Sequence, residues 1–265
     1  MIYSHTSLSL WNLCKRRWWH RYMRGVKEPQ TPVMLFSIYL LHETMMQPEP
    51  DWDAQWAKFT TEVGDASFKN TLLSLDTAKR IHRSFVAFKD EFEEIIAVER
   101  MELITLDPSL HQFQSKPDFV AKKEGICSTV DFKFVTSNWP SAKRPWPLRP
   151  LAAFDNQLLG QAITVGATGT EETVEKFVRV SFQGDRKSGN ISGPVIEEKC
   201  VDLALSSEWK AETIATIDEI EMWKAKDPGV PWPKNDQACN AFGKPCPHLA
   251  ACGAGWKRDL RSVQL

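Results

Sequence analysis

The stretch KPDFVAKKEGICSTVDFKFV, residues 116–135, contains two apolar segments separated by the polar turn Lys123-Glu124-Gly125. This pattern predicts a β-hairpin with one strand on each side of the turn. Asp118 stands at the start of the first segment, and Asp131 and Lys133 stand inside the second. Because side chains alternate along a strand, Asp131 and Lys133 are expected on one face, about 6.6 Å apart.

Two acids and a lysine in this arrangement favour hydrolysis of phosphate esters. Carboxylates collect divalent cations, and the cations stabilise both the attacking and the leaving oxygen of a phosphate. Charges inside an apolar run such as VDFKFV are costly unless they have a partner, and buried ionisable groups concentrate at functional sites. An isolated Asp-x-Lys also occurs by chance in exposed strands, so the pattern needs support from the rest of the chain.

Helices and strands are predicted to alternate through the rest of the chain. Thr31 followed by Pro32 marks a helix start, because proline at the first helical position loses no hydrogen bond. The other elements are assigned by their periodicity. The predicted helices run from Ser7 or Ser9 to about Met23, from Thr31 to Met46, over 52–63 and 76–96, from Leu151 to Val165 and from Leu205 to Lys226; the predicted strands are Ile95–Leu106, Gln112–Lys122, Cys127–Val135, 174–183 and 190–201.

Strands flanked by helices indicate an α/β fold with a mixed central sheet. No linker divides the 265 residues, so we expect one domain over 1–265: a helical cap region over 1–96, a core over 97–204, and a C-terminal helix with a cysteine-rich tail over 205–265. No apolar run could cross a bilayer, and the N-terminal basic cluster follows the apolar residues, the reverse of a secretory signal. A cytoplasmic protein without a membrane partner is expected. The net charge of −1 restricts any nucleic-acid surface to local patches.

The order of several motifs resembles the PD-(D/E)XK nuclease superfamily, in its RecB-like branch. That branch includes the nuclease domains of AddB-type recombination helicases and the iron–sulfur nucleases of CRISPR adaptation. The resemblance covers nearly the whole chain and implies a restriction-endonuclease-like core. The residues that carry it are, in order, His42, Asp118, Asp131 with Lys133, and Gln157.

The resemblance implies a role for each member of the hairpin. Asp118 and Asp131 would bind the divalent cation, Mg²⁺ or Mn²⁺, and Lys133 would position or activate the water. The backbone carbonyl of Phe132 would be a further ligand. His42, in SIYLLHE, matches a histidine ligand at the end of an early helix; taken alone, such a residue is as readily a helix-end histidine without a metal.

Other positions match the family less closely. Glu99 resembles an additional metal-binding acid of some members, and Glu102 competes with it. Gln157, in DNQLLGQA, matches a glutamine that helps to arrange the active site. Ser115 stands where a glycine often precedes the metal-binding aspartate, and Gln161 stands where the family has tyrosine.

Four cysteines form the second candidate site. Cys239, Cys246 and Cys252 are clustered near the C-terminus, and Cys14 stands in the first predicted helix. The RecB-like branch pairs one N-terminal cysteine with three C-terminal ones, so the resemblance implies a 4Fe-4S cluster bound by thiolates. A cross-link over so long a loop would act as a structural clasp. The spacing departs from the best-known members, which have two residues between the first two C-terminal cysteines.

Zinc is the competing interpretation of these residues. His248 lies between Cys246 and Cys252, so a Cys3His zinc site could form without Cys14. A disulfide framework is less expected in a cytoplasmic chain of this size with an α/β core, and unliganded buried cysteines are the last alternative. Cys127 and Cys200 are interpreted as small core residues.

Two segments that combine basic and aromatic residues are candidates for DNA contacts. Such combinations suit phosphate contacts and base stacking. For the segment in the first helix, the alternative is a solvated face whose tryptophans pack inward. The candidate DNA-binding residues are Arg16, Arg17 and Arg21, interleaved with Trp18 and Trp19, and Lys143, Arg144, Trp146 and Arg149 after the hairpin.

The expected function is therefore a metal-dependent DNA nuclease, an exonuclease or an enzyme directed to single strands and ends, stabilised by an iron–sulfur cluster. Its partners would be DNA and proteins of recombination, replication, phage biology or CRISPR adaptation. Two alternatives stay open: a catalytically silent DNA-binding or assembly module of the same fold, and a zinc-stabilised structural protein.

Overall fold

The computed structural model describes residues 2–64, 72–106, 111–137, 156–167, 173–185, 189–226, 232–235, 238–239 and 246–252. The chain divides into two compact units. Unit 1 comprises Met1–Pro29, Thr105–Phe113 and Lys210–Leu265, and unit 2 comprises Gln30–Ile104 and Gln114–Trp209.

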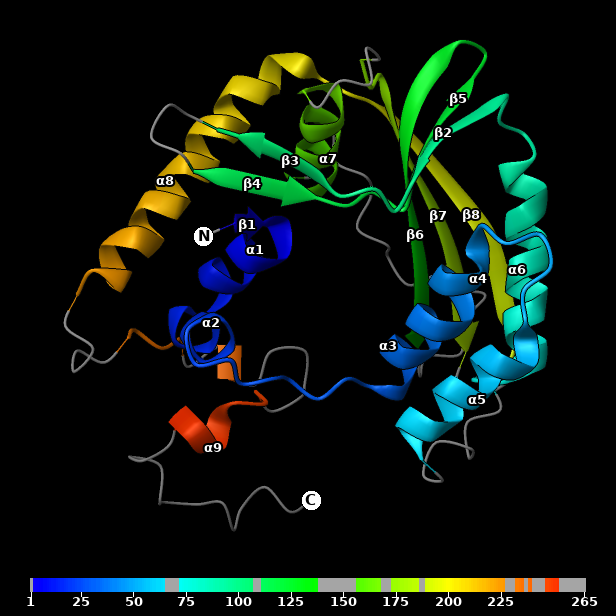
Figure 1. Ribbon diagram of the computed structural model, residues 1–265, viewed down its shortest axis with the longest axis horizontal. Helices are drawn as coiled ribbons and strands as arrows, with labels where there is room; N and C mark the ends of the chain where they lie inside the picture. The colour runs from blue at the N-terminus through cyan, green and yellow to red at the C-terminus, as the bar shows by residue number, and fades with distance from the viewer. Residues whose placement is uncertain are drawn as a thin grey trace. The chain divides into compact units, whose positions relative to one another are not determined.

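Unit 2 is built on a five-stranded mixed sheet of order β2-β5-β6-β7-β8 (Figure 1). β6 and β7 are parallel, and the other neighbours are antiparallel. A parallel pair needs a crossover connection, and α7, Asn156–Ala167, lies between these strands in sequence and contacts β6. The predicted α/β fold with a mixed, helix-flanked sheet is confirmed. The strands are β2 Glu94–Val98, β5 Phe119–Lys123, β6 Ile126–Ser137, β7 Lys176–Asp185 and β8 Ile191–Cys200.

The hairpin predicted from residues 116–135 is also confirmed. Lys123 pairs with Ile126, so the loop contains only Glu124 and Gly125. Both loop residues have positive φ, 54° and 75°, as a type I′ turn requires.

The helix predicted to start at Thr31 is confirmed, but its geometry changes along its length. Thr31 Oγ1 accepts a hydrogen bond from the backbone N of Met34 at 3.3 Å, and Pro32 occupies the first helical position. α3, Pro32–Phe36, is followed by a π-helix, η1, Ser37–His42, and by α4, Glu43–Met45. π-Helices are rare and often lie at functional sites.

The core of unit 2 lies between these helices and one face of the sheet. α5, Trp52–Val63, and α6, Leu75–Lys89, complete this helical layer (Figure 1). The ring of Phe85 in α6 meets those of Phe119 and Phe132 edge-on, with centroids 5.8 and 5.6 Å apart. The even-numbered side chains of the central part of β6 therefore face the helices, and Asp131 and Lys133 face the opposite side.

Three predicted boundaries in unit 2 are wrong. The helix predicted over 76–96 ends at Lys89, and the chain enters β2 at Glu94. The strand predicted over Ile95–Leu106 is broken at Glu99, whose φ of 44° does not fit a strand. The strand predicted over Gln112–Lys122 is divided at Pro117, which has no N–H for a ladder bond. The additional strands are β3, Glu102–Thr105, and β4, Gln112–Ser115, neighbours in a second, smaller sheet.

In unit 1, the first predicted helix is two helices, and the predicted caps Ser7 and Ser9 are wrong. Ser4 Oγ accepts from the N–H of Ser7, and Ser7 Oγ accepts from the N–H of Ser4. This reciprocal capping box makes Ser4 the N-cap. α1, His5–Leu13, ends at Cys14, which has an extended backbone, and α2, Lys15–Tyr22, follows. β1, Ile2–Ser4, precedes α1.

The remaining elements follow the expected order. The predicted helix Leu205–Lys226 is α8, Ser206–Lys224, preceded by the 3-10 turn η3, Leu203–Leu205, and α9, Leu249–Cys252, is a short helix that was not predicted. The predicted helix Leu151–Val165 corresponds to α7, and residues 151–155 lie outside the described residues. No helix in the described part of the chain is both long and apolar enough to span a membrane.

Candidate metal site

The candidate site lies where β5 begins and β6 continues past it. Phe119, the first residue of β5, pairs with Val130, so the backbone of Phe132 lies beyond the paired region. Asp118 occupies this place, and its Oδ2 accepts a hydrogen bond from the N–H of Phe132 at 2.6 Å. In an antiparallel ladder, the N–H and C=O of one residue point to the same neighbour. The Phe132 carbonyl is therefore expected to open toward the side where Asp118 lies.

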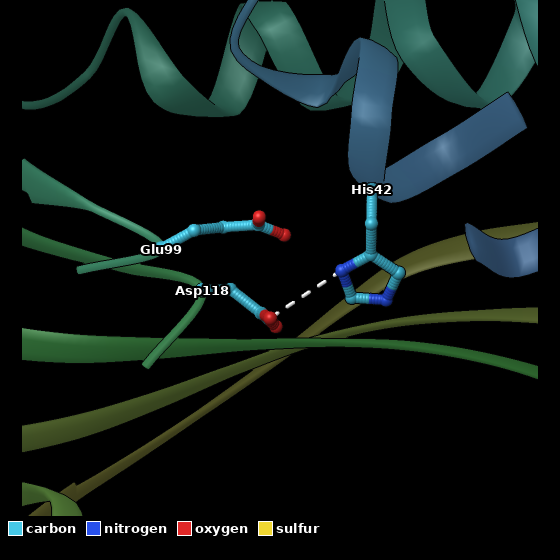
Figure 2. A group of neighbouring side chains, drawn as sticks. All are labelled: His42, Glu99 and Asp118. Carbon is cyan, nitrogen blue, oxygen red and sulfur yellow. Dashed lines mark ion pairs between the residues drawn. The ribbon is translucent and has the colours of Figure 1, made fainter. Parts of the chain in front are cut away.

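His42, Glu99 and Asp118 come together from three separate segments (Figure 2). One ligand atom of each lies within 4.8 Å of the other two. Nδ1 of His42 is 3.3 Å from Oδ1 of Asp118, and these two side chains are 24% and 17% exposed. Two carboxylates and one imidazole, partly open to solvent, form a ligand set that could hold a divalent cation.

His42 is held by the π-helix and by the core. It is the last residue of η1, and its ring meets the ring of Phe132 edge-on, with centroids 5.5 Å apart. Phe132 is itself 1% exposed. The imidazole is thus supported by the same strand whose backbone N–H fixes Asp118.

Glu99 reaches the site through an unusual backbone conformation. It follows β2 directly with φ of 44°, and its N–H donates to the backbone O of Asp118 at 2.9 Å. Left-handed backbone at a non-glycine residue costs on the order of 1 kcal/mol, and such residues gather at functional sites. Its carboxylate pairs with Lys116 Nζ at 2.9 Å. Glu102, the competing candidate, is buried and pairs with Arg100, so it is Glu99 that lies with His42 and Asp118.

Asp131 lies beside this group but is not one of its three members. Its side chain is 4% exposed, with Oδ1 2.7 Å from Lys133 Nζ and Oδ2 3.6 Å from Arg179 Nε. Burial raises the pKa of Asp131; Lys133 and Arg179 oppose the shift, and the Asp118 carboxylate adds to it. The two aspartates are therefore close enough to repel, which favours a cation near both. The Asp131–Lys133 contact also confirms that these residues share one face of β6.

Arg179 and Glu197 were not predicted as site residues. Arg179 pairs in register with Asp131 across β6 and β7, and Glu197 of β8 pairs in register with Arg179. The available signal was a charge inside the apolar run FVRVSF, the same signal that identified Asp131. What the sequence lacks is the register between two parallel strands that are distant along the chain.

Gln157 lies in the first turn of α7, half-buried, on a helix that contacts β6. Its catalytic role stays a prediction. The two departures from the family pattern also involve this helix: Gln161 is 4% exposed, and the hydroxyl of Ser115 bonds to that of Thr164.

The four cysteines predicted to bind a cluster line one pocket of unit 1. Cys14 comes from the break between α1 and α2, and Cys252 ends α9. The backbone N of Cys246 donates to the O of Cys239 at 2.7 Å. Burial raises the pKa of the Cys252 thiol, and the neighbouring thiols raise it further. All six cysteines of the chain are free of disulfides, and the rest of the pocket lining is Arg17, Lys234, Ala238 and Leu249.

His248, the nitrogen ligand of the zinc interpretation, is engaged elsewhere. Its Nε2 lies 3.2 Å from Glu28 Oε1, and its ring stacks on that of His20 with centroids 5.2 Å apart. His248 is not among the described residues that line the cysteine pocket.

The arginines of α2 differ in how they are bound. Arg17 makes two hydrogen bonds to Glu28, at 2.8 and 2.6 Å, and Arg16 Nε donates to the backbone O of Trp232 at 2.8 Å. Arg21 is 41% exposed, 3.8 Å from Glu28. Trp18 is fully buried and stacks on Trp232, so this tryptophan packs inward and is not available to stack on a base. The other predicted DNA contacts, Lys143, Arg144, Trp146 and Arg149, lie outside the described residues.

The fold of this chain is similar to that of a solved structure, although its sequence matches no protein-family model and no curated protein. The structure is similar to that of a protein from Eubacterium rectale, named provisionally as an exonuclease, with 13% identity and a TM-score of 0.54 over 95% of this chain and 92% of the other. The alkaline exonuclease LHK-Exo from Laribacter hongkongensis has a TM-score of only 0.31 and 16% identity, over 71% and 92% of the chains. The similarity to the Eubacterium rectale protein shows that the two chains share a fold.

Proposed function

We propose that this protein is a nuclease that hydrolyses phosphodiester bonds of DNA with the help of Mg²⁺ or Mn²⁺. The observation that carries the proposal is the convergence of His42, Glu99 and Asp118, with their ligand atoms within 4.8 Å of one another. The provisional name of the Eubacterium rectale protein, which assigns it as an exonuclease, supports the same class of activity.

The residues present fit a divalent cation. Carboxylate and imidazole ligands suit Mg²⁺ and Mn²⁺. Oδ2 of Asp131 is buried and has no hydrogen-bond partner within the described part of the chain. A buried carboxylate with a raised pKa gains from an added positive charge. His42, Glu99 and Asp118 would hold the cation, with Asp131 and the Phe132 carbonyl as the further ligands expected beside them.

A bound cation supplies an acidified water and stabilises the charge that develops on the phosphate. Lys133 Nζ lies 2.7 Å from Asp131 Oδ1, and its side chain is 40% exposed, so Nζ could turn toward the attacking oxygen and donate to it. The N–H of Phe132 fixes Asp118 Oδ2 and leaves Oδ1 on the side of His42. Gln157 would help to arrange the site from α7.

The finer form of the proposal is an exonuclease, or an enzyme directed to single strands and ends, of the RecB-like branch. It would be a cytoplasmic, single-domain protein that acts with proteins of recombination, replication, phage biology or CRISPR adaptation. The order of motifs along the chain supports this assignment, and the exposed Arg21 of α2 is available for phosphate contacts.

We also propose that Cys14, Cys239, Cys246 and Cys252 hold a 4Fe-4S cluster with a structural role in unit 1. All four line one pocket. At Zn–S bonds of about 2.3 Å, tetrahedral zinc needs sulfurs about 3.8 Å apart. No three cysteine or histidine ligand atoms of the described residues in unit 1 lie within 4.8 Å of one another. Thiolates spread over several irons fit this wider arrangement better than thiolates on one zinc ion.

The test is anaerobic purification followed by incubation with end-labelled single-stranded and duplex DNA. The native protein should shorten DNA with Mn²⁺ and leave it intact in EDTA. Asp118→Asn should be inactive, and Asp53→Asn, an exposed acid in the first turn of α5, should cleave like the native chain. Mononucleotide products indicate an exonuclease. DNA binding without cleavage in either Mg²⁺ or Mn²⁺ would identify the silent module instead.

A further inference from the structure

Asp131 has a second cationic neighbour, Arg179, on the adjacent strand. The two residues are in register across the parallel pair β6 and β7. Arg179 Nε lies 3.6 Å from Asp131 Oδ2, and the two side chains are only 11% and 4% exposed. They form a buried ion pair within unit 2, on the sheet face opposite the phenylalanine core.

A carboxylate buried to this degree requires compensation. Lys133 provides one positive charge at 2.7 Å, but its side chain is 40% exposed. If Lys133 turns to the substrate, that charge leaves Asp131. The Arg179 side chain is only 11% exposed, so its guanidinium can remain beside Asp131 while Lys133 moves.

Strand register places a second carboxylate on the same face of the sheet as Arg179. Glu197 is its registered partner on β8, so Arg179 lies between two strands that each present a carboxylate. The face is otherwise polar and incompletely satisfied. Among the described residues, Thr129 Oγ1, Ser181 Oγ and Glu197 Oε2 are buried atoms without a hydrogen-bond partner.

We propose that Arg179 is a positioning residue of the nuclease site, which compensates and orients the Asp131 carboxylate and so leaves Lys133 free to act on the substrate. The part of this inference that concerns cleavage rests on the proposed function. The part that concerns the coupling of Arg179 to Asp131 rests on the geometry alone.

The coupling is tested by a double-mutant cycle of Arg179→Met and Asp131→Asn, with urea unfolding followed in EDTA. Arg179→Met should lower the unfolding midpoint clearly in the native background and much less in the Asp131→Asn background, where no buried charge is left uncompensated. Lys176→Met is the matched control on β7, because Lys176 pairs with the exposed Glu198 at 3.4 Å. Its effect should be small and equal in both backgrounds. Equal losses for Arg179→Met in the two backgrounds would overturn the inference.

If Arg179→Met does not fold with Asp131 intact, Arg179→Lys takes its place in the comparison. Folding of Arg179→Met only beside Asp131→Asn would itself support the coupling. If Arg179→Met folds in neither background, the comparison is between Arg179→Lys and Arg179→Gln. A lysine variant that is no more stable than the glutamine variant would contradict the coupling, because the positive charge that lysine retains should stabilise the Asp131 carboxylate.

The catalytic part is tested by kinetics on end-labelled DNA with saturating Mn²⁺. Lysine cannot reproduce the fixed planar geometry of arginine, so Arg179→Lys should lower kcat by about 10- to 100-fold with KM nearly unchanged. A raised KM with normal kcat would mean that Arg179 binds DNA instead. A native protein that cleaves no DNA would refute the proposed function, while the urea cycle would still decide whether Arg179 compensates Asp131.

Discussion

The two candidate sites of this protein use opposite ligand chemistry. In unit 2, His42, Glu99 and Asp118 offer nitrogen and oxygen atoms that are partly open to solvent. In unit 1, four thiols line one pocket, and burial raises the pKa of Cys252. Oxygen ligands bind small, hydrated cations that exchange, whereas thiolates hold soft metals. The difference predicts one exchangeable, catalytic metal and one permanent, structural metal centre.

The largest expected effect is the loss of one acid from the unit 2 site. Asp118→Asn removes a charged ligand that the Phe132 N–H holds at 2.6 Å, so kcat/KM should fall by at least about 100-fold. The fold should persist, since the amide oxygen can still accept that hydrogen bond. Cleavage assays and far-UV circular dichroism on the same samples check both points, and native activity in this variant would remove Asp118 from the site.

Chelation provides the control that separates the two sites. Brief treatment with EDTA should abolish cleavage, and added Mn²⁺ should restore it, while the visible absorption of the cysteine centre stays constant. If the colour is lost together with the activity, the two metals do not differ in the way that their ligands imply.

Replacing a cysteine should have the next largest effect, on metal content rather than on chemistry. Cys252→Ser should lose most of its iron and sulfide and unfold at lower denaturant concentration, because the pocket then buries three thiols without a metal. Cys200→Ser is the matched control, because Cys200 is a free cysteine that is exposed and not, as predicted from the sequence, a core residue. Bound zinc in the native protein, with no iron, would decide for the zinc interpretation.

A smaller effect is expected on the pH dependence of the protein's stability, to which the buried Asp131 contributes. Because burial raises its folded pKa, the folded chain binds this proton more tightly than the unfolded chain does. Stability is therefore lost as pH rises from the unfolded pKa, about 3.9, through the raised folded value. Asp131→Asn mimics the protonated form, so in EDTA at pH 8 it should raise the thermal midpoint by about 2–4 °C.

The difference between Asp131→Asn and the native chain should shrink as the pH is lowered toward 4. A variant that is less stable than the native chain at pH 8 would mean that the ion pairs with Lys133 and Arg179 outweigh the cost of burial. Either result sharpens the contrast between this buried acid and the partly exposed Asp118.

Local signals in the sequence were sufficient for the hairpin and for the helix at Thr31. Glu124 and Gly125 suit a tight turn, and Thr31 with Pro32 suits a helix start, because both depend only on neighbouring residues. Alternation along β6 was likewise enough to place Asp131 and Lys133 on one face. The break at Glu99 was missed, since glutamate gives no local sign of a positive φ.

Register between distant strands could not be predicted in the same way. Arg179 meets Asp131 only because β6 and β7 pair in parallel at one particular offset. Ser4 was missed as a cap because its partner Ser7 is itself a good cap residue, and the choice depends on the geometry of the first turn. His42 and Glu99 were candidates because of their order in the chain. That their ligand atoms lie close to Asp118 depends on the tertiary structure, which the sequence pattern does not give.

The smallest expected effect concerns two arginines one helical turn apart on α2. Arg21 is 41% exposed, so Arg21→Gln should weaken binding of single-stranded DNA about two- to threefold in EDTA and reduce the slope of log K against log salt by about 0.7. Arg17 is held by Glu28 at 2.6 Å and lines the cysteine pocket, so Arg17→Gln should leave that slope unchanged and lower iron retention instead. Fluorescence anisotropy at several salt concentrations and iron assays measure both. A salt slope that changes for Arg17 and not for Arg21 would assign Arg17 to DNA and end its link with the cysteine pocket.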